Sequence, residues 1–263
     1  MSDVLFLGHG SPMNAVEDND FTKAHIQLGS SLKSKFQGII SISAHWLTEG
    51  TLVQASEFPE QLYDFSGFPK ELYELKYQVK GSPEFANTLT QKLKDATFKA
   101  QTTTEWGCDH GIWSLLCRMF PEGGITCVQV SIDVDLPFDE YLRMGKTLAA
   151  FRDDGWLILA SGNIVHNLRR MNFSPSAAVP DWAQRFERWV DEKVQGRDFG
   201  ALVTFKGTSE QDVHASHPSL DHYVPLIYAL GAVRGDDLIR APIKGFQLST
   251  ISMQSYQFTQ VST

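Results

Sequence analysis

The sequence predicts an α/β protein in which a twisted, mostly parallel (mixed) central sheet is flanked by helices. Short, predominantly apolar runs at residues 4–7, 39–42 and 156–160 are typical of strands buried on both faces. Stretches with helical spacing of apolar residues, such as 181–194, lie between such runs. No repeat, low-complexity tract or linker interrupts the chain, so a single domain is expected over residues 1–263.

Capping residues and breakers indicate where the elements begin and end. Ser82 followed by Pro83 begins a helix, Asp109 can cap a helix that extends to Met119, and Gly196 ends another. Further predicted elements are strands at 51–55 and 125–132, a helix at 135–151, and an alternating closing strand at 246–258, antiparallel at an edge or in a final pair.

Composition limits the partners and the compartment. The net charge is −8 and no Lys/Arg-rich run occurs, which argues against nucleic acid or an acidic membrane surface as a partner. No apolar stretch approaches the roughly 20 residues of a membrane span, and the first residues do not read as a signal peptide. The three cysteines, Cys108, Cys117 and Cys127, form no CxxC pair, so we expect reduced thiols and a cytoplasmic protein.

Histidines follow the predicted buried strands. His9 comes directly after the first strand, His45 after the second, and His166 after the strand that begins at Trp156. Each alone could be an ordinary structural residue. Because parallel strands bring their carboxyl ends to one edge of a sheet, three such histidines predict a shared site at that edge.

The remaining histidines add to this set. His110 is expected at the first turn of a helix, and three histidines, His214, His217 and His222, fall within nine residues, in a segment whose first half Pro218 keeps out of a helix. Only His25 has no suggestive context, and it is expected on the surface of a helix.

Clustered neutral imidazoles at a sheet edge predict a transition-metal site, for which zinc, iron, copper and nickel are all suitable. A catalytic site needs about three protein ligands and an open position, which leaves further histidines for acid–base work. These residues predict a histidine-rich metal enzyme; a zinc-dependent hydrolase, a tetrapyrrole metal chelatase, and a non-catalytic protein that binds a metal or a small aromatic are the other interpretations.

Five motifs, in order along nearly the whole chain, favour the first alternative. They are GHGSP at 8–12, SAHW at 43–46, DHG at 109–111, SGNIVHN at 161–167 and DHYVPL at 221–226. Together they resemble the class III extradiol ring-cleavage dioxygenases, and most closely the 4,5-DOPA dioxygenase branch. The resemblance implies that O2 is inserted into a catechol, L-DOPA or a related one, to give a hydroxymuconic semialdehyde.

The resemblance also implies roles for individual residues. It implies metal ligands at His9, His45 and His222, an acid–base role for His166, and a second active-site histidine near the substrate at His110. Fe(II) is expected for turnover, whereas a purified sample could contain zinc, with His166 completing a tetrahedral set. A catechol and O2 are the expected partners, and the oligomeric state is left open.

Three further expectations concern the surroundings of the site. Three neutral imidazoles would leave a divalent metal without balancing protein charge, so a catecholate would supply it. His214 and His217 could lie behind the ligands, and Asp221 could either orient a histidine or cap the following helix. The aromatic loop at 63–77 could form a wall of the substrate site.

Overall fold

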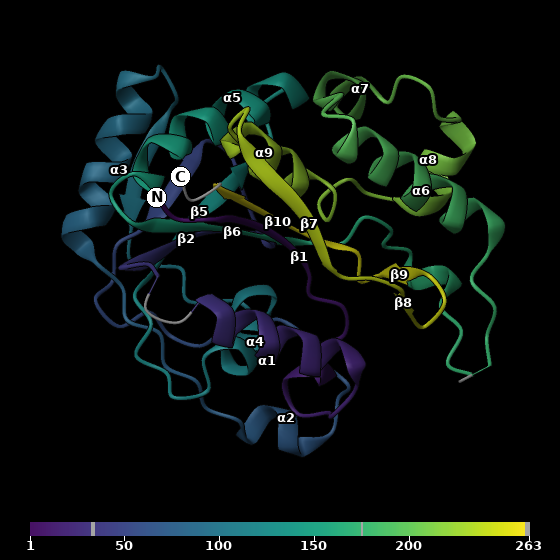
Figure 1. Ribbon diagram of the computed structural model, residues 1–263. Coiled ribbons are helices and arrows are strands. Elements are labelled where there is room, and N and C mark those ends of the chain that lie inside the picture. Colours follow the sequence, from purple (N-terminus) through teal and green to yellow (C-terminus); the bar gives the residue numbers. More distant parts are fainter. Residues whose placement is uncertain (33–34, 175, 261–263) are drawn as a thin grey trace.

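The computed structural model describes residues 1–32, 35–174 and 176–260, which form a sheet between two layers of helices (Figure 1). Among these residues the main sheet has eight strands in the order β4-β3-β5-β2-β6-β1-β10-β7. These eight strands are β1 (Val4–Gly8), β2 (Gly38–Thr48), β3 (Thr51–Gln54), β4 (Ala100–Thr103), β5 (Cys127–Asp133), β6 (Trp156–Gly162), β7 (Asp237–Ile243) and β10 (Ser255–Gln260). Two short strands, β8 (Phe246–Gln247) and β9 (Ile251–Ser252), pair with each other in a small separate sheet.

The helices cover both faces of this sheet. They are α1 (Asp20–Leu32), α2 (Lys70–Glu74), α3 (Pro83–Asp95), α4 (His110–Met119), α5 (Phe138–Leu148), α6 (Asp181–Gln195), α7 (Phe199–Thr204), α8 (Glu210–Ser216) and α9 (Val224–Ala232). Short 3-10 turns are η1 (Pro12–Ala15), η2 (Ala149–Arg152) and η3 (Leu168–Arg170). Helices α1, α2 and α4 lie on one side of the sheet, and α3, α5 and α9 lie on the other (Figure 1).

The centre of the sheet is parallel, as the sequence predicts. Strand β6 pairs in parallel with β1 and β2, and β2 pairs in parallel with β5. Antiparallel pairs flank this centre, β3 with β5 on one side and β10 with β1 and β7 on the other. The predicted mixed α/β sheet is therefore confirmed, and the carboxyl ends of β1, β2 and β6 meet at one edge.

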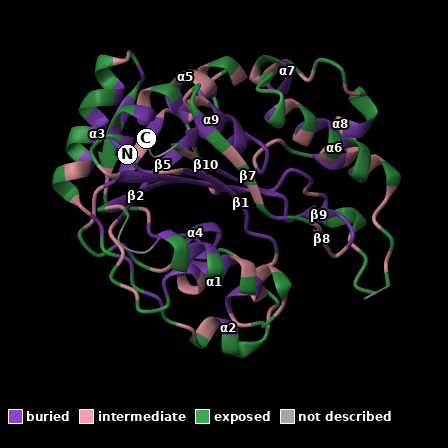
Figure 2. Ribbon diagram, in the orientation of Figure 1, coloured by how far each residue is buried: buried purple, intermediate pink, exposed green. Residues whose placement is uncertain are grey.

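Apolar runs are needed in the central strands because both faces are buried (Figure 2). In β1, Val4 and Phe6 belong to the core under α3, α5 and α9, whereas Leu5 and Leu7 belong to the core over α1 and α4. Side chains alternate between the faces of a strand, so a strand covered on both faces is apolar along most of its length.

The second strand is longer than the sequence predicts. It runs to Thr48 and so contains His45, but its register against β5 shifts between Ile42 and Leu47. Its pairing with β6 ends at Ser43. His45 therefore lies in an irregular part of the strand, where a bulge can direct a side chain toward a site.

The prediction of one continuous closing strand at 246–258 is wrong. Leu248 and Ser249 take positive φ angles of 49° and 62°, so the chain turns between β8 and β9 before β10 begins. The predicted antiparallel pairing of the end of this segment is confirmed by β10. Strands β4 and β7 were not predicted, because their exposed, alternating residues lack the apolar run of a central strand.

Two histidine placements differ from the expectation. His25 is not a surface residue, since its side chain lies in the buried face of α1 and only 1% is exposed. His214 lies within helix α8 rather than in a loop, and the irregular part of that segment begins at His217. The three cysteines are free. None of the helices over the described part of the chain is long and apolar enough to cross a membrane.

A buried ion pair ties the chain start, η2 and β7 together. The Arg152 guanidinium donates to both carboxylate oxygens of Asp237 at 2.7 and 2.8 Å, and also to the carbonyls of Ser2 and Ala232. Both side chains are fully buried. Removal of one partner would leave a buried charge uncompensated.

Asp237→Asn should therefore lower the free energy of unfolding by about 3–5 kcal/mol, measured by chemical denaturation. The matched control is Asp153→Asn, which removes a partner of the exposed Arg234 and should change stability by less than about 1 kcal/mol. Equal effects of the two substitutions would contradict this role of the buried pair.

Candidate active site

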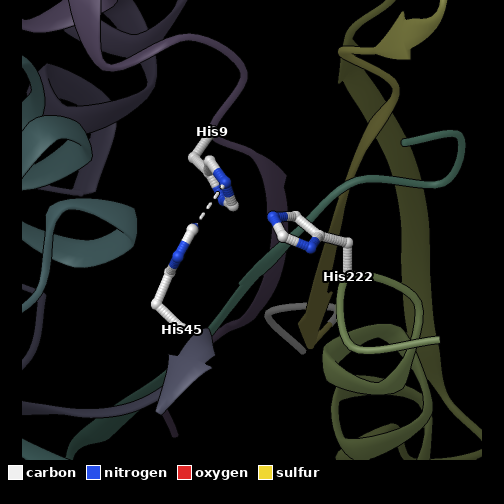
Figure 3. Close-up of side chains that lie close together, drawn as sticks. All are labelled: His9, His45 and His222. Atoms are coloured by element: carbon white, nitrogen blue, oxygen red, sulfur yellow. Dashed lines mark hydrogen bonds between the residues drawn. The ribbon is translucent and has the colours of Figure 1, made fainter. Parts of the chain in front are cut away.

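Three predicted histidines converge at the carboxyl edge of the sheet. His9, His45 and His222 each offer a ring nitrogen, and these three atoms lie within 4.8 Å of one another. Figure 3 shows the rings of His9 and His45 meeting tip to tip, with His222 facing them from the segment before α9. The described residues thus bring together the three side chains that the resemblance implies as metal ligands.

A glycine allows the segment of His222 to approach the sheet. His222 accepts a hydrogen bond on its carbonyl from the Asn163 amide at 2.9 Å, and His9 donates its amide to the carbonyl of Gly162 at 3.2 Å. A Cβ atom on Gly162 would lie 2.3 Å from the His222 carbonyl oxygen. Because that contact is with backbone, a side chain at 162 would displace His222.

The proton of the His9 ring is held on Nδ1. Ser161 Oγ lies 2.9 Å from His9 Nδ1 and donates its own proton to the carbonyl of Gly111 at 2.5 Å. A hydroxyl has one proton to donate, so Ser161 must accept from His9. His9 Nδ1 is therefore protonated, and the lone pair of a neutral ring lies on Nε2.

Carboxylates fix the other two rings in the same way. Asp221 Oδ2 lies 2.7 Å from His222 Nδ1, and Asp64 Oδ2 lies 3.3 Å from His45 Nδ1. A carboxylate only accepts, so His222 Nδ1 carries a proton and its Nε2 carries a lone pair. For His45 the negative charge of Asp64 beside Nδ1 favours the same arrangement. Of the two expectations for Asp221, the orientation of a histidine is the one observed, because no side-chain cap bond forms at the start of α9.

The three Nε2 atoms fit a metal ion. His9 Nε2 and His45 Nε2 are 3.2 Å apart, and His222 Nε2 is buried with no hydrogen-bond partner. Two unprotonated nitrogens at that distance repel each other unless a cation lies between them. Nitrogen ligands about 2.0–2.1 Å from a tetrahedral metal would be about 3.3 Å apart, close to the observed separation.

Burial keeps the imidazoles neutral and able to bind a metal. It lowers the pKa of His9 and of His222 far below the ordinary value, and the neighbouring histidines lower both further. The pKa of His45 is also lowered by burial and by His110, although Asp109 and Asp64 oppose this shift. Neutral imidazole is the form that ligates a metal.

His110 lies beside this group and shares an acceptor with it. Asp64 Oδ1 accepts from the amide of His110 at 2.9 Å, and Asp64 Oδ2 accepts from His110 Nδ1 at 2.9 Å. Burial raises the pKa of Asp64, but the hydrogen bond and charge of His110 and the charge of His45 outweigh it, so the pKa is lowered. Asp64 therefore satisfies the N-terminus of α4 and orients two histidines.

Asp109 does not cap α4 with its side chain, in contrast to the expectation. Its carboxylate is fully buried and accepts from Ser43 Oγ at 2.6 Å and from Gln129 Nε2 at 2.9 Å. Ser43 Oγ in turn accepts from the amide of His45 at 3.2 Å. Asp109 thus supports the bulge that carries His45.

His166 stacks on His222, with ring centroids 3.5 Å apart and an angle of 5° between the planes. Burial lowers the pKa of His166 to about 4, so the ring is neutral near pH 7. His166 does not belong to the group of three converging nitrogens, and its predicted place as a fourth zinc ligand stays a prediction.

A pocket of about 1630 Å³ opens over the histidines. His9, His45, His110, His166 and His222 all line it. The loop after Asp64 contributes Phe65 and Phe68, and the Phe65 ring meets His110 edge-on at 5.3 Å. Part of the aromatic loop at 63–77 thus forms a wall of this pocket.

The other two histidines lie outside the group. His214 is exposed on α8 and lies 3.4 Å from Glu210. His217 is buried, its Nε2 donates to the carbonyl of Ile164 at 2.5 Å, and its ring packs on Phe186 and Tyr223. His217 thus stabilises the segment between β6 and His166.

Two residues of the site escaped sequence reasoning. Asp64 is one of three acids in the aromatic loop at 63–77, and only its pairing with His110, 46 positions later, distinguishes it. Ser161 lies in the SGNIVHN motif, but a serine at the end of a strand can have many ordinary structural roles. The contact with His9 distinguishes it, and that contact depends on the parallel pairing of β1 with β6.

Comparison with known proteins identifies the class. The chain matches, over residues 3–261, the family described as the catalytic LigB subunit of aromatic ring-opening dioxygenase, and it belongs to that family. A 4,5-DOPA dioxygenase extradiol of Escherichia coli (strain K12) is 40% identical, and the alignment covers 96% of this chain and 93% of the relative. The protein of the same name from Beta vulgaris is 31% identical, with 98% and 97% covered.

A solved structure agrees with this assignment. The crystal structure of an uncharacterized protein from Escherichia coli K12 matches with a TM-score of 0.84 and 37% identity, covering 98% of this chain and 99% of that chain. The protein is thus an extradiol aromatic ring-opening dioxygenase, a metal-dependent enzyme whose substrates are a small molecule and O2. These relatives favour ring opening over the hydrolase and chelatase alternatives.

Gly162→Ala should displace His222 and weaken binding of a divalent metal at least tenfold, because the new Cβ meets backbone. Calorimetric titration of the metal-free protein measures this. Gly200→Ala is the control, since a Cβ there meets nothing within 4 Å and metal affinity should stay unchanged. Unaltered affinity in the Gly162 variant would show that the His222 segment adapts freely.

Proposed function

We propose that the protein cleaves the ring of L-DOPA or a closely related substituted catechol at the 4,5 position and forms a hydroxymuconic semialdehyde. The observation that carries the proposal is the set of three neutral imidazoles whose Nε2 atoms converge at the base of an aromatic-walled pocket. Relatives named 4,5-DOPA dioxygenase extradiol, at 40% and 31% identity over nearly the full chain, support the choice of substrate.

His9, His45 and His222 are the proposed metal ligands. The support is the proton on Nδ1 of His9 and His222, which Ser161 and Asp221 accept, and the carboxylate of Asp64 beside Nδ1 of His45, which together leave each Nε2 free to ligate. Fe(II) is the proposed metal for turnover, because reaction with O2 needs a redox-active ion. Zinc also accepts three nitrogen ligands but has no redox chemistry, so a zinc-loaded sample would be inactive.

Bound Fe(II) supplies the redox chemistry that joins the catechol to O2. The chain supplies the proton transfer, and His166 is the proposed acid–base residue. Its pKa of about 4 keeps it neutral near pH 7, so it accepts a proton from a catechol hydroxyl and returns it later as an acid. The stacked ring of His222 holds His166 in the pocket wall.

His110 is the proposed second active-site histidine. Asp64 accepts from His110 Nδ1, so His110 Nε2 is the nitrogen left to hydrogen-bond substrate or oxygen atoms in the pocket. Phe65, edge-on to His110, places an apolar wall there and excludes water from the reacting atoms.

Oxygen uptake tests the function most directly. Protein stripped of metal without air and reloaded with Fe(II) should consume one O2 per L-DOPA and form a yellow semialdehyde. A zinc-loaded sample should consume none. Failure to take up O2 with L-DOPA, caffeate and protocatechuate alike would overturn the proposal.

Variants separate ligation from proton transfer. His222→Ala should lose Fe(II), because it removes one of three ligands. His166→Gln should keep Fe(II) and lose about 10²–10⁴-fold in turnover, the usual size of an acid–base contribution. Metal content and O2 uptake are measured together. The control His214→Ala, an exposed residue on α8, should retain both.

Ser161→Ala should weaken Fe(II) binding about 10–100-fold, since residues that orient a ligand histidine usually contribute that much. Without the hydroxyl, the His9 ring is no longer held with its proton on Nδ1. Ser131→Ala, which removes another buried hydroxyl from the sheet without touching the site, should leave affinity unchanged. If both variants bind Fe(II) like the parent, Ser161 does not determine the state of His9.

A further inference from the structure

The charges around the pocket are unevenly distributed. Its lining includes four acidic side chains, Glu17, Asp20, Asp64 and Asp221. Asp64 and Asp221 are occupied by histidines, whereas Glu17 and Asp20 are exposed at the mouth. Arg169 is the one Lys or Arg among the described lining residues. Among the described lining residues, Arg169 is therefore the one permanently charged cation that an anionic ligand would meet in the pocket.

The backbone of Arg169 is fixed although its side chain is exposed. Asn167 accepts from the Arg169 amide at 3.1 Å and is itself held, because its side-chain amide donates to the carbonyl of Ala215 at 2.7 Å and its carbonyl accepts from Thr250 Oγ at 2.9 Å. The backbone of Arg169, in η3, is thus held in place at the rim of the pocket.

The Arg169 guanidinium is not committed to another group. The ion pairs formed within the described ranges do not include Arg169, and its recorded hydrogen bond is that of its backbone amide. Its neighbour Arg170 differs, since that guanidinium lies over the Trp182 ring at 5.4 Å. A planar guanidinium without a partner is suited to bind a carboxylate with two parallel hydrogen bonds.

The position of Arg169 relative to His166 suits a bound catechol. The two residues are three positions apart in the sequence, so their Cα atoms lie at most about 11 Å apart even in an extended chain. A catechol with a two- or three-carbon acid side chain is of comparable length. Its hydroxyls can therefore lie at the histidines while its carboxylate reaches the pocket rim.

We infer that Arg169 binds the carboxylate of the substrate's side chain and so makes the enzyme prefer catechols with an anionic substituent. This inference rests on the proposed ring-cleaving function and adds a residue that determines specificity. The neighbouring acids make binding of such a side chain depend on Arg169, because without this residue the charged groups of the lining would only repel an anion.

The test compares two catechols that differ in the carboxylate. These are 3-(3,4-dihydroxyphenyl)propionate and 4-methylcatechol, assayed by O2 uptake with the Fe(II)-loaded protein. Arg169→Gln should raise KM for the acid about tenfold or more, the size expected for a charge-assisted hydrogen bond, and should change KM for 4-methylcatechol less than about twofold. Arg169→Lys should recover part of the loss, and the control Arg170→Gln should behave like the parent with both substrates.

The outcomes are distinguishable. A rise of KM confined to the acid, with partial recovery by lysine, supports the carboxylate contact. Equal effects of Arg169→Gln on KM for both catechols, or no effect on either KM, would overturn the inference. In that case turnover of the catechols by the parent protein would still support ring cleavage. If the parent consumes no O2 with either catechol, the proposed function itself fails, and the inference fails with it.

Discussion

The site depends on where the protons of three imidazole rings are held. Neutral histidines can meet at one point only if each keeps its proton on the far nitrogen, and an oxygen acceptor lies behind each ring. Ser161, Asp64 and Asp221 are these acceptors. They turn three lone pairs toward one position, where 3.2 Å between two nitrogens is repulsive without a cation. The fold therefore builds a site that is stable with a metal bound.

The acceptors also change the charge of the site. If the protein offered only three neutral imidazoles, a bound catecholate would have to balance the whole charge of a divalent metal, as we expect from the sequence. The structure instead places Asp221 in a hydrogen bond behind the His222 ring, Asp64 3.3 Å behind the His45 ring, and the buried Asp109 nearby. Carboxylates behind a ligand histidine make its free nitrogen more basic. Negative charge from the protein thus contributes to the binding of a cation before any substrate arrives.

Backbone geometry brings the rings together. The parallel pairing of β1, β6 and β2 aligns their carboxyl ends. Near His45 the register of β2 against β5 is irregular, so side chains there depart from the simple alternation between the two faces of the sheet. Gly162 lets the turn that carries His222 lie against the sheet, where a Cβ would collide with backbone. The three imidazoles, which come from distant parts of the chain, can converge on one point only because all of these conditions hold at once.

The sequence alone determined the layered α/β fold, since strands covered on both faces show as predominantly apolar runs. It also determined which histidines follow those strands, and its motifs indicated the family that the comparisons confirm. It did not determine the weakly apolar edge strands β4 and β7, the burial of His25 or the role of Asp64, because each depends on contacts between distant segments. The pairing of Ser161 with His9, and with it the state of the ring, likewise exists only once parallel strands place them 2.9 Å apart.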